Sequence, residues 1–84
     1  MRPTLKNWSF DGIGLRGAVY NYPDKEEGKY IATSNLLEMR RDGDELIAVC
    51  ASREYLLEDV DPGYERAYPN IVERMLKQFE HKLN

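Results

Sequence analysis

The chain has 84 residues, 42% of them hydrophobic, which predicts a single folded domain over residues 1–84 and argues against disorder. Twelve basic residues against fifteen acidic ones give a net charge of −3, so the chain lacks the basic stripe typical of nucleic-acid-binding proteins. One cysteine excludes an internal disulfide, and no apolar run is long enough to span a membrane, so we expect a soluble, cytoplasmic protein.

The N-terminal part of the chain is predicted to be a β-hairpin. Residues 5–10 alternate loosely, and Asp11-Gly12 follows, a pair that favours a type I′ turn because both central residues need positive φ. Residues 13–22 are the return strand, whose two faces carry Ile13, Leu15, Gly17 and Val19 on one side and Arg16, Ala18, Tyr20 and Tyr22 on the other. Its internal glycines, Gly14 and Gly17, predict a bulge, a sharp coil or a close approach of another backbone.

The stretch around which the chain is organised is residues 30–39. Two short β segments, 30–33 and 36–41, are predicted to meet there at a polar break, Ser34-Asn35. A second Asp-Gly turn then leads into a strand over residues 45–51. This strand contains five consecutive apolar residues, which indicates that both of its faces are covered, either by a C-terminal helix or by a second subunit. A last strand is expected at residues 54–58.

The C-terminal segment is predicted to be an amphipathic helix that follows a loop over residues 59–68. Asn70 is a good N-cap, and Glu73 stands three residues later, which approximates a capping box. The apolar stripe of this helix consists of Ile71, Val72, Met75, Leu76, Phe79 and Leu83. We therefore expect a helix over about residues 70–82.

About five short antiparallel strands over residues 5–58, followed by one helix, make an α+β domain. The predicted architecture is a curled sheet or small SH3-like barrel with the C-terminal helix packed on it. A flatter sheet with the helix across one face is the second alternative.

No residue pattern predicts catalysis or metal binding. The only histidine, His81, lies near the predicted helix end, and Cys50 lies in an apolar run, where a free cysteine behaves as a small hydrophobic residue. One cysteine and one histidine cannot form a zinc site within one chain. Acidic residues alternate between Asp59 and Glu65 as at the start of a calcium loop, but the later ligands are missing. We expect no enzyme, no catalytic residue, no metal and no cofactor.

Tyrosine and arginine are the residue types that point to binding, since the chain has six tyrosines, with arginines spread among them. Aromatic rings stack on nucleotide bases, and guanidinium groups bind phosphate. The predicted ligand-binding residues are Arg16, Thr33, Ser34, Arg53 and Tyr55. The reason is that strand interruptions at Thr33-Ser34 and Ser52-Arg53 would leave free backbone N–H groups beside hydroxyls and a cation. The alternative is that these side chains only fill barrel ends and cover apolar edges.

Several short segments form a further pattern over nearly the whole chain: LKNW (5–8), DG (11–12), LRGAVY (15–20), Gly28, IATS (31–34), LLEM (36–39), YLL (55–57), YERAYPN (64–70) and ER (73–74). Together they resemble a set of very small phage and prophage proteins, mostly of unassigned function. Members of that set tend to have glycine where this chain has Leu57.

The resemblance implies an accessory phage protein that acts in the cytoplasm of the host cell against host defence. Such proteins bind a host effector, as anti-CRISPR proteins do, or sequester a nucleotide signal, as the Thoeris and CBASS antagonist sponges do, often between subunits of a homo-oligomer. Our leading hypothesis is a non-enzymatic antagonist of host immunity that sequesters a small nucleotide signalling molecule at an oligomer interface. The alternatives are an anti-CRISPR-like inhibitor of a host defence protein that uses an acidic surface, and a small structural or regulatory domain without a ligand.

Overall fold

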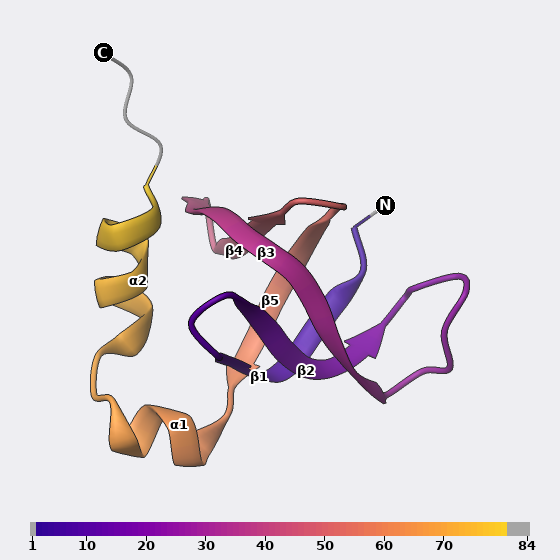
Figure 1. Ribbon diagram of the computed structural model, residues 1–84, viewed down its shortest axis with the longest axis horizontal. Coiled ribbons are helices and arrows are strands. Elements are labelled where there is room, and N and C mark those ends of the chain that lie inside the picture. The colour runs from indigo at the N-terminus through magenta and orange to yellow at the C-terminus, as the bar shows by residue number, and fades with distance from the viewer. Residues whose placement is uncertain (1, 81–84) are drawn as a thin grey trace.

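The computed structural model describes residues 2–80, which form five strands followed by two helices (Figure 1). The elements are β1 (Thr4–Phe10), β2 (Gly14–Tyr20), β3 (Lys29–Asp42), β4 (Glu45–Cys50), β5 (Glu54–Val60), α1 (Pro62–Ala67) and α2 (Ile71–Phe79). The predicted α+β class is therefore confirmed. The last part of the predicted helix, with His81 and Leu83, lies outside the described residues.

The five strands form a ring-like sheet. Consecutive strands pair antiparallel, and a parallel pair between β1 and β5 closes the ring, with Leu5 opposite Leu57. The prediction of a curled sheet is confirmed, and the flatter alternative is wrong. The ring differs from a true barrel because the first half of β3 pairs with β2 and the second half with β4.

β3 is one continuous strand of 14 residues, where the sequence predicted two segments. Thr33 and Ser34 together oppose Leu15 of β2, and Leu37 is an extra residue relative to β4. Such bulges bend a strand without ending it. The polar break predicted at Ser34-Asn35 is therefore the place where β3 changes its pairing partner.

The first hairpin turn lies one residue later than predicted. The Asp11 N–H donates to the Gly14 carbonyl at 3.1 Å, so the central residues are Gly12 and Ile13, and of these only Gly12 has positive φ, at 96°. A type I′ turn needs positive φ at both central residues, so the predicted type I′ turn is wrong. The Asp11 carboxylate accepts the N–H groups of Gly14 and Ile13, both at 2.9 Å, and these bonds, with the nearby Arg16 guanidinium, lower the pKa of Asp11. Ile13 is 65% exposed and does not share the buried face of Leu15.

Both glycines of β2 lie against another backbone, which is one of the three alternatives that the sequence left open. A Cβ atom at Gly17 would lie 2.8 Å from the Lys6 carbonyl oxygen, where β1 bulges and places two residues opposite Gly17. A Cβ atom at Gly14 would lie 2.7 Å from the Ser34 carbonyl oxygen. These distances leave no room for a side chain at either position.

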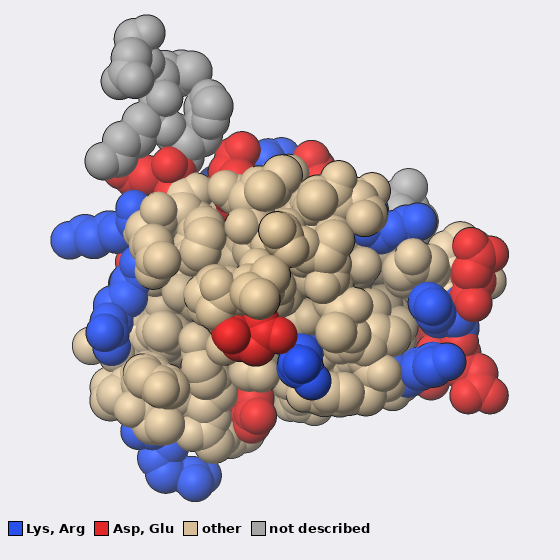
Figure 2. Space-filling model, in the orientation of Figure 1, with Lys and Arg blue, Asp and Glu red and all other residues tan. Residues whose placement is uncertain are grey.

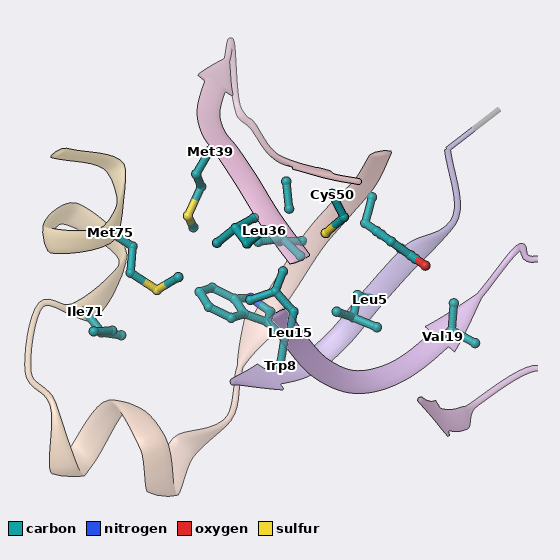
Figure 3. Packing of buried hydrophobic residues seen from close by; sticks show 12 residues of the cluster. Leu5, Trp8, Leu15, Val19, Leu36, Met39, Cys50, Ile71 and Met75 are labelled. Carbon is teal, nitrogen blue, oxygen red and sulfur yellow. The ribbon is translucent and has the colours of Figure 1, made fainter. Parts of the chain in front are cut away.

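The hydrophobic core fills the ring and continues to α2, which covers one end of it (Figure 3). Met75 and Ile71 are the buried residues of α2, and Met75 points toward the indole of Trp8 (Figure 3). On β4, the neighbouring residues Ile47 and Ala48 face opposite sides of the sheet, and both are fully buried. The prediction that this strand is covered on both faces is confirmed, and the chain provides this cover without a second subunit.

The segment predicted as a loop contains a short helix, α1. Pro62 is its first residue, and the Asp61 carboxylate accepts the N–H of Gly63 at 3.0 Å, which is a good helix start. The capping box predicted for α2 is wrong, because Asn70 has φ 62° and makes no side-chain capping hydrogen bond. Within residues 2–80, no helix is long and apolar enough to cross a membrane.

Candidate functional site

Tyr22, Arg53 and Tyr55 form a cluster on the side of the ring away from α2, where the β4–β5 turn and the loop after β2 lie (Figure 1). We call them the tyrosine–arginine cluster. The guanidinium carbon of Arg53 lies 4.2 Å from the centroid of the Tyr22 ring, a cation–π contact. Tyr55 is buried beside them. Its burial raises its pKa, and the neighbouring Tyr22 raises it further, while Arg53 opposes the shift.

Arg53 differs from the other arginines of the sheet because it forms no ion pair with the residues that the structure describes. Four arginines pair with carboxylates: Arg2 with Glu54 at 2.7 Å, Arg16 with Asp11 at 3.2 Å, Arg40 with Glu38 at 3.4 Å and Arg41 with Glu73 at 3.1 Å. The exposed Arg53 lines a hollow of about 380 Å³ together with Arg2, Pro3 and Glu54. Its guanidinium is therefore held by stacking and keeps its hydrogen-bond donors available.

Tyr22 is not among the predicted site residues, because strand alternation predicts that it shares a face with Arg16 and Tyr20. The strand ends at Tyr20, and Asn21 adopts a left-handed conformation with φ 61°. This breaks the alternation, and Tyr22 packs against the core. Asparagine tolerates positive φ better than most residues, so Asn21 was the available signal that the strand ends there.

The hydroxyl groups of Thr33 and Ser34 bind the backbone of the protein itself. Thr33 Oγ1 accepts the N–H of Leu15 at 2.9 Å and donates to the Ser34 carbonyl at 2.8 Å. Ser34 Oγ accepts the N–H of Ser52 at 2.9 Å. The expectation that the Ser52 N–H would be free for a ligand is wrong, because the two hydroxyls join β2, β3 and the β4–β5 turn.

Thr33→Val should lower the free energy of unfolding by about 2 kcal/mol, because it leaves the fully buried Leu15 with an unpaired backbone N–H. Chemical denaturation followed by circular dichroism measures the loss. Thr33→Ser keeps the hydroxyl and should retain most of the stability. Equal stability of the valine variant and the original protein would contradict a structural role for this hydroxyl.

The five predicted site residues occupy two regions. Arg53 and Tyr55 belong to the tyrosine–arginine cluster, and Ser34 is bonded to the turn that carries Arg53, next to Thr33. Arg16 lies apart on the outer face of β2, opposite Ala32, and pairs with Asp11.

A second hollow, of about 430 Å³, lies between the helices and the ring. Its walls include four acidic residues and one basic residue: Asp44, Asp59, Glu65, Glu73 and Arg41.

Among residues 2–80, no three histidine, cysteine, aspartate or glutamate side chains are grouped so that they could hold a metal ion. Cys50 lies in the core, where burial raises the pKa of its thiol.

No protein-family model, curated protein or solved structure matches this chain.

Proposed function

We propose that the protein is a non-enzymatic binding protein that captures a small phosphate-bearing, nucleotide-like molecule at the tyrosine–arginine cluster. The observation that carries this proposal is the exposed Arg53 guanidinium, stacked on Tyr22 and without a carboxylate partner among the described residues. The biological role proposed with it, a phage-type antagonist of host immunity that acts as a nucleotide sponge, comes from the sequence resemblance.

The stacked geometry favours phosphate recognition for a physical reason. The Tyr22 ring covers one face of the Arg53 guanidinium and limits its motion, so less side-chain entropy is lost when a ligand binds. The N–H groups at the edge of the guanidinium can form paired hydrogen bonds to phosphate oxygens. At the same hollow, the Arg2 guanidinium has its charge paired with the Glu54 carboxylate, whereas Arg53 has no carboxylate partner among the described residues.

Isothermal titration calorimetry with AMP, ADP, ATP, ADP-ribose and cyclic dinucleotides tests the proposal. We expect at least one of these to bind, and Arg53→Ala to weaken binding by about 10-fold to 100-fold, the usual effect of losing a charged hydrogen-bond donor. Arg53→Lys should bind at an intermediate level because lysine lacks the planar fork.

Arg66→Ala is the matched control. Arg66 is an exposed arginine of α1 that does not line this hollow, so its removal changes the net charge equally and should leave binding unchanged. Absence of binding across the panel, or equal weakening by the Arg66 and Arg53 substitutions, would refute the proposed site.

The acidic lining of the hollow between the helices and the ring favours a second candidate function, an inhibitor that binds a basic surface of a host defence protein. Capture of such a protein from lysate should then weaken with salt and be lost on Asp59→Lys together with Glu65→Lys. Retention of the captured protein by this double variant would exclude the acidic hollow as its binding surface.

A further inference from the structure

The first half of β3 has one edge that no strand of the described chain covers. Residues 29–35 pair with β2 on one side, while β4 begins to pair only at Leu36. On the open side, the Asn35 carbonyl has a partner within the chain, because it accepts the N–H of Ala51 at 2.9 Å. Residues 30–32 precede this contact along β3, and no described strand pairs with them on this side.

The backbone groups directed to this edge belong to Tyr30 and Ala32. The Val19 carbonyl accepts the N–H of Gly28 at 2.7 Å, so the backbone groups of Val19 face β3. Backbone groups alternate in direction along a strand, so those of Gly17 also face β3, where Gly17 lies opposite Ile31. The N–H and C=O groups of Tyr30 and Ala32 therefore point away from β2.

The side chains beside this edge do not oppose pairing with another strand. Tyr30 is 60% exposed and Ala32 is exposed and small. Lys29 is the only charged residue among residues 29–35. In Figure 2, charged side chains lie mainly around the rim of this view of the molecule, with few in its centre. An uncovered strand edge of this kind is a template for pairing with another chain.

We propose that the edge of β3 pairs antiparallel with the same edge of a second copy of this chain, with Ile31 on the two-fold axis. In this register Tyr30 of each copy lies opposite Ala32 of the other, and all four backbone groups directed to the edge on each copy form hydrogen bonds. A large side chain then lies beside a small one, and Lys29 lies opposite Thr33, so no like charges meet.

The two neighbouring two-fold registers each leave backbone N–H and C=O groups of Tyr30 or Ala32 without a hydrogen-bond partner. With Tyr30 opposite Tyr30, Ala32 would face Gly28, whose N–H is already bonded to Val19. With Ala32 opposite Ala32, Tyr30 would face Ser34 in the bulge, where the Ser34 carbonyl already accepts the Thr33 hydroxyl at 2.8 Å. The self-complementary register favours a second copy over an extended peptide of another protein. This proposal does not depend on the ligand proposed above.

Substitutions that place charged residues in the proposed interface test the proposal. The molar mass of the protein is measured by light scattering over a range of protein concentrations. The original protein should form a dimer of twice its mass of 9.8 kDa as the concentration rises. The double variant Tyr30→Lys, Ala32→Lys places lysines opposite each other and should remain a monomer, as should Tyr30→Glu, Ala32→Glu. An equimolar mixture of the two variants should form a heterodimer, because every lysine then faces a glutamate.

The matched control is the double variant Ile13→Lys, Leu37→Lys, which changes two side chains of similar exposure, 65% and 60%, away from the edge. It should dimerise like the original protein. Ala32→Pro should also fold, because the N–H that it removes points away from β2, and should remain a monomer. The proposal is overturned if the original protein is monomeric at millimolar concentration. It is equally overturned if the control pair abolishes dimerisation while the edge variants retain it.

Discussion

Replacement of Trp8 by alanine is expected to lower the free energy of unfolding by about 4 kcal/mol, the largest effect that we expect for a single substitution. Trp8 is only 1% exposed and lies where the ring meets both helices. Its ring centroid is 6.5 Å from that of Tyr64 in α1, and Met75 of α2 points toward its indole (Figure 3). Removal of the indole therefore leaves a cavity that three parts of the fold share.

Urea denaturation followed by circular dichroism measures this loss, because the variant no longer contains the only tryptophan as a fluorescent probe. Small domains have about 5–15 kcal/mol of stability, so the variant should be partly unfolded at moderate temperature. Trp8→Phe keeps an aromatic ring and should show a smaller loss that can be measured in a folded protein. Leu37→Ala removes a 60% exposed side chain and should change stability by less than about 0.5 kcal/mol. Similar losses for Trp8→Ala and Leu37→Ala would contradict the described core.

Gly17→Ala should lower the free energy of unfolding by about 3 kcal/mol, although it adds only one methyl group. The added Cβ would lie 2.8 Å from the Lys6 carbonyl oxygen and 3.1 Å from Trp8 Cα, both backbone atoms that cannot rotate away. The β1–β2 pair must separate locally to admit it, and the bulge in β1 opposite Gly17 would be distorted.

Gly63→Ala is the matched control for this substitution. Gly63 lies in α1, where a Cβ atom would meet only Asp61 Oδ1, at 3.7 Å. Alanine is the better helix former, so this variant should be as stable as the original protein or gain up to about 1 kcal/mol. Equal, small effects at both glycines in the same denaturation assay would show that the backbone contact at Gly17 is looser than described.

Local sequence patterns predicted the elements of this fold because those patterns act over a few residues. Alternation along β2 identified Leu15 and Val19 as buried, and the apolar stripe identified Ile71 and Met75 as the face of α2 that packs on the ring. Glycine at position 17 indicated an irregular strand, and of the alternatives that it left open the structure has a close backbone approach. Asp-Gly pairs marked both hairpin turns, although at Asp11 the aspartate acts through its side chain and the turn is centred one residue later.

The candidate site could be predicted only in part. The content of arginine and tyrosine predicted Arg53 and Tyr55 as binding residues, and these two residues lie in one cluster. Tyr22 was missed because one left-handed residue, Asn21, reverses the side to which it points. Arg16 has a nearby carboxylate that sequence spacing did not reveal, and the hydroxyls of Thr33 and Ser34 are used by neighbouring strands.

The sequence by itself determined which segments are extended, where the chain turns and which faces are apolar, because the spacing of side chains along a segment decides these properties. Only the tertiary structure decided that β3 changes partner at its centre, that β1 and β5 close the ring in parallel, and which arginines pair with carboxylates. These features depend on hydrogen bonds and ion pairs between residues far apart in the chain, such as Leu56 with Pro3 and Arg41 with Glu73. No local sequence pattern specifies such partners, because these residues come together only when the whole sheet closes around one core.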